Sequence, residues 1–192
     1  MKNIYIIAGP NGAGKTTASY TILPEIFNCD EFVNADEIAK GLSPFNPDAV
    51  AIQSGRMMLQ RIHDLLANNK SFALETTLST KSYTSLIRKA KNKGYTITLL
   101  FLSLDSIDLA INRVSIRVKE GGHNIPIDVI KRRFIKGLKN LFNLYIPIVD
   151  KWLLINNSEK EFRTIARGSI NGTFFVENKS IWQQLKKTYN DN

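Results

Sequence analysis

Short apolar runs alternate with longer stretches of helical periodicity along the 192 residues of the chain. The apolar runs are rich in β-branched and aromatic residues and predict five strands, at 3–8, 31–34, 71–75, 95–102 and 151–156. Nearly continuous apolar runs are typical of parallel strands that are buried on both faces. Because helical segments separate them, the pattern predicts an α/β fold of three layers, with a central, mostly parallel sheet between helices.

The segments between the strands carry readable helix boundaries. Asn46 and Pro47 predict a capped helix start with Asp48 in its first turn. Gly94 predicts the end of a helix over 80–93. A further helix is expected from Pro126 onward, with an apolar stripe of Ile130, Phe134, Leu138, Leu141 and Tyr145 that ends before Pro147.

The chain shows no internal repeat and no linker, so we expect a single domain over residues 1–192. Within it, residues 113–133 combine arginines with a Gly-Gly turn and predict a basic helical lid. Residues 158–192 are expected to form a C-terminal element, with a hairpin around Asn171-Gly172 and a closing helix over 181–189.

Composition excludes several classes of protein. A hydrophobic fraction of 43% with 22% charged residues is ordinary for a globular protein and excludes general disorder. The one cysteine, Cys29, excludes an internal disulfide framework and cannot supply a four-ligand zinc site. No apolar run has the length of a signal peptide core or a membrane span, so we expect a cytoplasmic protein without a membrane partner.

Positive charge is concentrated in one region. The formal net charge is +9, and residues 81–140 alone hold 13 basic and 4 acidic residues. A field of one sign favours an anionic ligand, such as nucleotide phosphates, nucleic acid or an acidic protein. The alternative for part of these residues is that they lie on solvated helix faces and keep the protein soluble.

A phosphate-binding motif follows the first predicted strand directly. Residues 9–17 match G-x-x-x-x-G-K-[ST] and read Gly9, Pro10, Asn11, Gly12, Ala13, Gly14, Lys15, Thr16 and Thr17. The glycines allow successive backbone N–H groups to converge on one anion, and the following helix directs its positive dipole end at it. Lys15 is expected to reach the β- and γ-phosphates, and the Thr16 hydroxyl to hold Mg²⁺. No Asn/Thr-Lys-x-Asp guanine-reading motif is present, so we expect ATP rather than GTP.

Two carboxylates are placed where a phosphotransferase needs them. Asp36 follows the second predicted strand and is a candidate to orient an acceptor hydroxyl, although it also suits a helix N-cap, as does Asn34. Glu75 ends the third predicted strand and is a candidate for ordering Mg²⁺ or binding substrate, with Thr76 beside it. A plain solvent-facing strand end is the alternative for Glu75.

Cations for the transferring phosphoryl group come from the predicted lid. Arg113 and Arg117 are four residues apart, so they share a helix face next to Gly121-Gly122. His123 and Arg56 are further candidates for substrate contacts. The sequence does not decide whether His123, Arg117 or Arg133 completes the lid.

The ordered set of motifs resembles the zeta toxin family, in the form of its chromosomal, zeta-like members. It consists of GPNGAGKTT, Asn34-Ala35-Asp36, Ser54-Gly55-Arg56, Leu74-Glu75-Thr76-Thr77-Leu78, Arg113-Val114 with Arg117-Val118, Gly121-Gly122-His123 and Asn156-Asn157-Ser158. The resemblance runs from residue 4 to the tail. It implies a P-loop kinase fold and an ATP- and Mg²⁺-dependent kinase with UDP-N-acetylglucosamine as acceptor, inhibited by an antitoxin protein.

The resemblance also implies roles for residues. Lys15 would be the phosphate lysine, Asp36 the catalytic base, Glu75 the acid at the metal or substrate, and Arg113 a phosphate-binding arginine. The chain departs from the plasmid toxins where their second lid arginine falls near His123, which puts Arg117 or Arg133 forward instead.

Three functions are therefore compared. The first is a kinase of a small anionic acceptor such as a nucleotide sugar. The second is a kinase of nucleosides or nucleic acid ends, which the basic region favours but the scarcity of aromatic residues within it disfavours, so nucleic acid is not expected as a partner. The third is a nucleotide-dependent switch that transfers no phosphate.

Overall fold

The computed structural model describes residues 1–122, 124–159 and 161–190. Its centre is a seven-stranded sheet in the order β2-β3-β1-β4-β5-β6-β7. The strands are β1 (Lys2–Ala8), β2 (Phe32–Val33), β3 (Phe72–Thr76), β4 (Tyr95–Ser103), β5 (Lys151–Asn156), β6 (Arg163–Ser169) and β7 (Phe174–Val176). The first five in this order pair in parallel, and β6 and β7 pair antiparallel. The predicted α/β fold with a mostly parallel sheet is confirmed.

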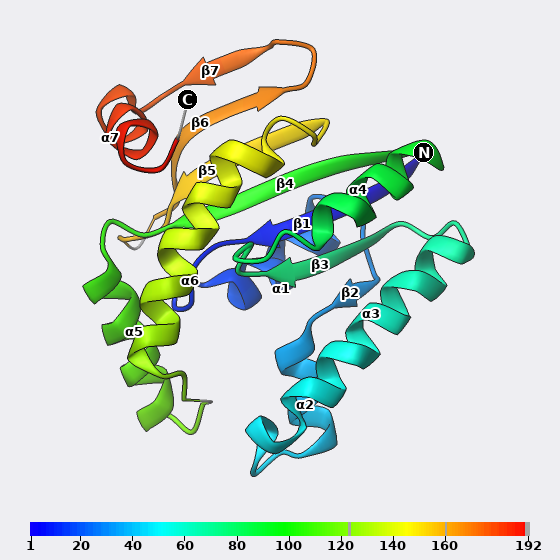
Figure 1. Cartoon of the computed structure of the whole chain (residues 1–192), viewed down its shortest axis with the longest axis vertical. Coiled ribbons are helices and arrows are strands. Elements are labelled where there is room, and N and C mark those ends of the chain that lie inside the picture. Colours follow the sequence, from blue (N-terminus) through cyan, green and yellow to red (C-terminus); the bar gives the residue numbers. More distant parts are fainter. Residues whose placement is uncertain (123, 160, 191–192) are drawn as a thin grey trace.

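Helices connect successive parallel strands and cover the sheet. They are α1 (Lys15–Glu25), α2 (Ala35–Leu42), the 3-10 helix η1 (Pro47–Val50), α3 (Ala51–Ala67), α4 (Tyr83–Asn92), α5 (Ile107–Lys119), α6 (Ile127–Asn140), the π-helical turn η2 (Leu141–Tyr145) and α7 (Lys179–Tyr189). Connections between parallel strands through a helix are right-handed. Therefore, a helix covers one face of the sheet when the next strand lies to one side of the first, and the other face when it lies to the other side. The step from β1 to β2 is opposite to the steps from β3 to β4 and from β4 to β5. Accordingly, α1 lies behind the sheet and α4 and α6 lie in front of it in Figure 1.

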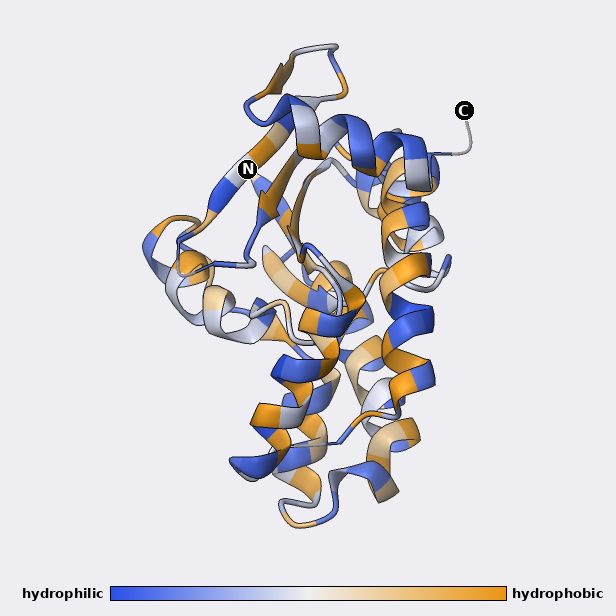
Figure 2. Ribbon diagram, turned by 90° about the vertical axis from the view of Figure 1, so that its left-hand side faces the viewer, coloured by the Kyte–Doolittle hydropathy of each residue, from blue (hydrophilic) through white to orange (hydrophobic). Residues whose placement is uncertain are grey.

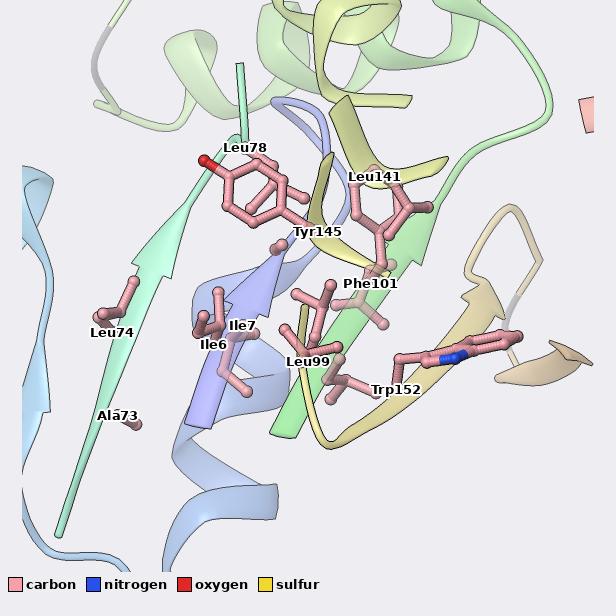
Figure 3. Close-up of a cluster of buried hydrophobic side chains, with 14 of the residues drawn as sticks. Ile6, Ile7, Ala73, Leu74, Leu78, Leu99, Phe101, Leu141, Tyr145 and Trp152 are labelled. Carbon is pink, nitrogen blue, oxygen red and sulfur yellow. The ribbon is translucent and has the colours of Figure 1, made fainter. Parts of the chain in front are cut away.

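The core lies between the sheet and its helices. Ile6, Leu74 and Leu99, from three adjacent strands, have no exposed surface. Leu141 and Tyr145, from the segment after α6, lie against the same cluster (Figure 3). The helices alternate hydrophilic and hydrophobic segments along their length, as amphipathic elements on a buried sheet must (Figure 2). The apolar stripe predicted after Pro126 is therefore confirmed as a core face.

Two predicted helix boundaries need correction. The segment at Asn46 begins a 3-10 helix, and the Asn46 side chain makes no capping hydrogen bond. The helix predicted from residue 80 begins at Tyr83. The preceding turn is held from outside, since Asn140 donates to the Leu78 carbonyl at 2.8 Å and the Tyr145 hydroxyl donates to the Thr80 carbonyl at 2.6 Å. The predicted end at Gly94, with φ +80°, is confirmed.

The predicted C-terminal hairpin and helix are present, and β6 and β7 of the hairpin extend the sheet beyond β5 (Figure 1). Aromatic side chains join them to the core, because Trp182 of α7 stacks on Trp152 of β5 with ring centroids 5.7 Å apart. Among the described residues, no helix combines the length and the apolar character that crossing a membrane requires.

Candidate active site

The glycine-rich loop 9–14 joins β1 to α1 at the carboxyl end of the sheet. Gly9 has φ +146°, and a Cβ there would overlap the Leu102 carbonyl of β4. Gly14 has φ +77°, and a Cβ there would lie 2.8 Å from the Asn157 amide nitrogen. Both positions require glycine for conformation and for space. The loop thus has the tight turn and helix N-terminus that bind phosphate.

Neighbouring segments support this loop from behind. The Asn157 amide, in the loop after β5, donates to the Ala13 carbonyl at 2.8 Å. The Arg113 guanidinium donates to the carbonyls of Asn157 at 2.7 Å and Ser158 at 2.8 Å, and more weakly to that of Gly12 at 3.4 Å. The sequence predicted that Arg113 binds phosphate from a lid, whereas in this structure it binds backbone carbonyls. Asn157 was indicated by the sequence only as part of a family pattern, because its partner is 144 positions away.

Lys15 lies at the start of α1 and is buried, with 7% of its side chain exposed. Its ammonium donates to the Pro10 carbonyl at 3.0 Å and lies 3.7 Å from Glu75 Oε1. Burial lowers the pKa of Lys15, and the nearby charges of Glu75 and Asp36 oppose that shift. A phosphate group in the loop would supply the anionic partner that this buried cation otherwise finds in Glu75.

Glu75, at the end of β3, is the centre of a hydrogen-bonded group. Its Oε2 accepts from the Thr16 hydroxyl at 2.8 Å and from the Asn34 amide at 2.8 Å. Burial raises the pKa of Glu75, and Lys15 and the Thr16 hydroxyl counteract the shift. Glu75 is therefore a partnered carboxylate with only 9% of its side chain exposed, and the alternative of a solvent-facing strand end is wrong.

Asp36 lies in the first turn of α2, two residues after the cap. The cap is Asn34, whose Oδ1 accepts from the Asp36 backbone N–H at 2.8 Å. The alternative that Asp36 itself caps the helix is therefore wrong. Its carboxylate is available for another role, and Asp36 lines a polar cavity next to the loop.

This cavity has a volume of about 350 Å³ and extends from Thr16 to the end of α5. Its walls come from the first turns of α2 and from η1, and from the C-terminal part of α5 with the turn that follows it. Four carboxylates and two cations line it: Asp36, Glu37, Asp48, Glu120, Lys40 and Arg117. Lys40 pairs with Glu37 at 2.7 Å.

Of the other described residues predicted for the site, one lines the cavity and the rest do not. Arg117 lines the cavity, but Arg56 does not and is exposed on α3. Thr76, the last residue of β3, accepts a hydrogen bond from the Leu78 backbone N–H at 3.0 Å and so stabilises the turn that follows the strand. His123 lies outside the described residues.

Most of the basic region faces solvent rather than the cavity. On α6, the exposed residues include Lys131, Arg132, Lys136 and Lys139. Arg133 is half-buried; burial lowers its pKa and the charge of Asp36 opposes that shift, which places Arg133 within electrostatic reach of the site. Of the predicted lid cations, Arg117 thus lines the cavity and Arg133 interacts electrostatically with Asp36.

The donor set suits a magnesium ion that is shared with a nucleotide. Thr16 and Glu75 offer a hydroxyl and a carboxylate side by side, both hard oxygen ligands. Within the described ranges, no group of three or more His, Cys, Asp or Glu residues is arranged to hold a metal alone. Mg²⁺ commonly uses one or two protein ligands together with phosphate oxygens, so these residues fit it.

A glycine-rich loop followed by Lys15 and Thr16, on a parallel sheet with β3 between β1 and β2, defines a protein of the P-loop kinase fold. Comparison with protein-family models then identifies the family. The model of the family described as "Zeta toxin" matches residues 1–161, and the chain belongs to this family.

Other proteins are similar to this chain. An uncharacterized protein of Haemophilus influenzae is 31% identical over 129 residues, which cover 66% of this chain and 88% of that protein. Among solved structures, a chain of the AvrRxo1-ORF1:AvrRxo1-ORF2 complex matches with a TM-score of 0.78 at 19% identity. The match covers 96% of this chain but only 63% of that longer chain.

Two further structures show the same fold. A chain from the structure of the PezAT chromosomal toxin-antitoxin system of Streptococcus pneumoniae matches with a TM-score of 0.63 at 15% identity. The match covers all of this chain and 79% of that chain. A gluconokinase from Sinorhizobium meliloti matches 82% of this chain and 83% of its own, with a TM-score of 0.51 at 14% identity. At these identities the structural matches show the fold alone.

Proposed function

We propose that this protein is an ATP-dependent kinase that transfers the γ-phosphoryl group of ATP to a hydroxyl of a small acceptor. One observation carries the proposal: Thr16 of the phosphate-binding loop and the Asp36 carboxylate line the same cavity. A hydroxyl-bearing molecule in this cavity would lie between a carboxylate that can take its proton and a loop built for phosphate.

The chain's own residues supply the parts of the reaction. Backbone N–H groups of the loop and the N-terminus of α1 would hold the β- and γ-phosphates. Lys15 would exchange its contact with the Pro10 carbonyl for a phosphate oxygen. Thr16 and Glu75 would hold Mg²⁺, which when bound neutralises charge on the β- and γ-phosphates. Arg117, which lines the cavity, and Arg133 would stabilise the charge that spreads over the transferring group.

Asp36 would act on the acceptor. Its carboxylate would accept a hydrogen bond from the acceptor hydroxyl and align its oxygen with the γ-phosphorus. The new bond forms between that oxygen and phosphorus, and the bond from phosphorus to the β–γ bridging oxygen breaks. The hydroxyl proton passes to Asp36, and ADP leaves with the bridging oxygen.

For the acceptor, we propose the amino-sugar hydroxyl of UDP-N-acetylglucosamine as the first molecule to test. Membership of the zeta toxin family supports this choice. Within the cavity, Arg117 and Lys40 are the cations that a diphosphate could contact, although Lys40 already pairs with Glu37. The surrounding carboxylates suit hydroxyl and amide donors of a sugar.

The structural matches support two further parts of the proposal. One is ATP as the phosphoryl donor, because a matching structure is described as AvrRxo1-ORF1:-ORF2 with ATP. The other is an antitoxin protein as a partner, because another matching chain comes from a toxin-antitoxin system. We propose both for this chain on the basis of the shared fold and family.

The test is a transfer assay with γ-labelled ATP, Mg²⁺ and either UDP-N-acetylglucosamine or a metabolite extract, followed by mass identification of the labelled product. Asp36→Asn is expected to lower transfer about 10²–10⁴-fold while nucleotide binding is retained. Asp108→Asn is a matched control, since Asp108 occupies the same second position after its cap on α5 but is exposed outside the cavity. Full transfer by Asp36→Asn would remove Asp36 from the reaction, and hydrolysis that releases all of the label as inorganic phosphate, with no labelled acceptor, would favour a switch.

A further inference from the structure

The side-chain amide of Asn34 joins the Glu75 carboxylate to the backbone of Asp36. Its Nδ2 donates to Glu75 Oε2 at 2.8 Å, and its Oδ1 accepts from the Asp36 backbone N–H at 2.8 Å. The residue is 5% exposed, so solvent does not compete effectively for these contacts. A single planar group therefore joins the end of β3 to the first turn of α2.

The sheet places Asn34 there. Val33 of β2 is in register with Leu74 of β3, so the next residues along the two parallel strands, Asn34 and Glu75, lie side by side. The Asn34 carbonyl accepts from the Ile38 backbone N–H at 3.1 Å and begins the helical hydrogen bonds. Both the backbone carbonyl and the side chain of Asn34 are thus hydrogen-bonded at the point where β2 ends and α2 begins.

The two contacts require an amide. The contact to Glu75 needs a donor and the contact to α2 needs an acceptor, and among short side chains asparagine offers both in one fixed plane. Serine, threonine and aspartate are also favoured N-cap residues and could cap α2. However, serine and threonine are too short to span the amide's reach to Glu75, and an ionised aspartate has no donor for it.

The contact fixes the orientation of Glu75. Oε2 receives both Thr16 and Asn34, which directs Oε1 toward Lys15 at 3.7 Å. We infer that Asn34 is a positioning residue, which sets the Glu75 carboxylate for Mg²⁺ and couples it to the helix that carries Asp36. The inference rests on the proposed function only for the roles of Glu75 and Asp36; the coupling itself is a property of this chain.

The test separates capping from positioning. Asn34→Ser and Asn34→Thr retain a cap for α2 and lose the donor to Glu75. The matched control is Asn178→Ser, because Asn178 caps α7 by accepting from the Ile181 backbone N–H at 3.1 Å, away from the site. Each protein is titrated calorimetrically with a non-hydrolysable ATP analogue at a series of Mg²⁺ concentrations. Melting temperatures and transfer kinetics are measured on the same samples.

Both Asn34 variants keep a cap for α2 but lose the hydrogen bond to the Glu75 carboxylate, so they are expected to melt a few degrees below Asn178→Ser, at about 2–4 °C per kcal/mol lost. The Mg²⁺ concentration for half-maximal analogue binding is expected to rise about 10–100-fold, with a comparable loss in kcat/KM, as for other residues that orient a metal ligand. Unchanged Mg²⁺ dependence and kcat/KM in both variants would reduce Asn34 to a helix cap and overturn the inference. Should Asn34→Ser fail to fold, Asn34→Thr provides the same comparison with a side chain suited to the extended backbone at this position.

The binding experiment is independent of the proposed activity. If wild type transfers phosphate to no acceptor, the proposed function fails, yet the Mg²⁺ titration still decides the role of Asn34. If wild type binds the analogue equally well with and without Mg²⁺, the inference about Asn34 fails even where transfer is observed.

Discussion

The Arg113 guanidinium donates to the Asn157 backbone carbonyl at 2.7 Å, and the Asn157 side chain donates in turn to the Ala13 carbonyl at 2.8 Å. Helix α5, the loop after β5 and the phosphate-binding loop are therefore joined by consecutive hydrogen bonds. A loop that binds phosphate through backbone N–H groups must hold these groups in place before the ligand arrives. This support explains why an arginine beside the loop is occupied by carbonyl oxygens.

Replacing Arg113 by lysine is expected to destabilise the protein without nucleotide. An ammonium cannot reproduce the planar fork that contacts Asn157 and Ser158, so one half-buried carbonyl loses its partner, at a cost of about 1–3 kcal/mol. Urea unfolding without ligand measures this loss. Arg88→Lys, at an exposed position of α4, is the control. A variant of wild-type stability that still loses phosphoryl transfer would instead support the predicted contact of Arg113 with phosphate.

Gly14→Ala is expected to disturb the same support from the other side. Its Cβ would lie 2.8 Å from the Asn157 amide nitrogen, and its φ of +77° costs a further ~1–2 kcal/mol for any residue with a Cβ. Gly94→Ala isolates the second cost, because Gly94 has φ +80° and a Cβ there would extend into open space.

A double-mutant cycle with Asn157→Ala tests the steric part of that prediction. Removing the Asn157 side chain also removes its hydrogen bond to Ala13, so the single variant is itself expected to lose about 1 kcal/mol. In this background, Gly14→Ala is expected to cost less than in wild type, since the obstructing amide is gone. Equal costs in both backgrounds, by urea unfolding, would show that the Asn157 side chain is not the obstacle.

Local sequence signals predicted the strands and the phosphate-binding loop because their causes are local. Apolar runs reflect burial within one element, and the glycines of residues 9–14 meet a requirement of their own turn. The same reasoning placed Asp36 just after one predicted strand and Glu75 at the end of the next, and in the structure these strands, β2 and β3, are neighbours. These residues were predictable without knowledge of the strand order.

Contacts between distant segments were not predictable in this way. The spacing of Arg113 and Arg117 indicated one helix face, yet Arg113 extends to carbonyls of the loop after β5 and Arg117 lines the cavity. The pairing of Asn34 with Glu75 follows from the β2–β3 register, which the apolar pattern does not specify. The positive charge of residues 81–140 indicated an anionic ligand, but charge counts do not say which side chains face the cavity.

Gly122→Ala is expected to displace Arg117 from the cavity. A Cβ at Gly122 would lie 2.6 Å from Arg117 Cγ and 2.8 Å from its carbonyl oxygen, which accepts the Gly122 backbone N–H. Shifting a charged group by about 1 Å in such a site costs up to ~10²-fold in kcat/KM for the acceptor. Gly121→Ala is the control, since it has φ +87° but open space around its Cβ. Equal kinetic losses in the two variants would assign the effect to a general disturbance of this turn instead of to Arg117.

The raised pKa of Glu75 makes its contribution to stability dependent on pH. Burial is the main cause of the shift, so between the ordinary glutamate pKa of about 4.3 and the raised value, the folded protein binds a proton that the unfolded chain has released. Stability from this group is fully present below the ordinary pKa and is lost as pH rises through the folded pKa. Glu75→Gln removes the titration while keeping a side chain of the same shape.

The difference in unfolding free energy between wild type and Glu75→Gln is therefore expected to fall as pH rises and then level off. The total decrease in this difference gives the shift in the Glu75 pKa on folding, at about 1.4 kcal/mol per pKa unit. Urea unfolding at a series of pH values, with a metal chelator and no nucleotide, provides the curves, and Glu25→Gln at the exposed end of α1 is the control. A difference that rises with pH would mean that the charge of Lys15 outweighs burial at Glu75. In that case the carboxylate would be stabilised in its ionised form before Mg²⁺ or ATP binds.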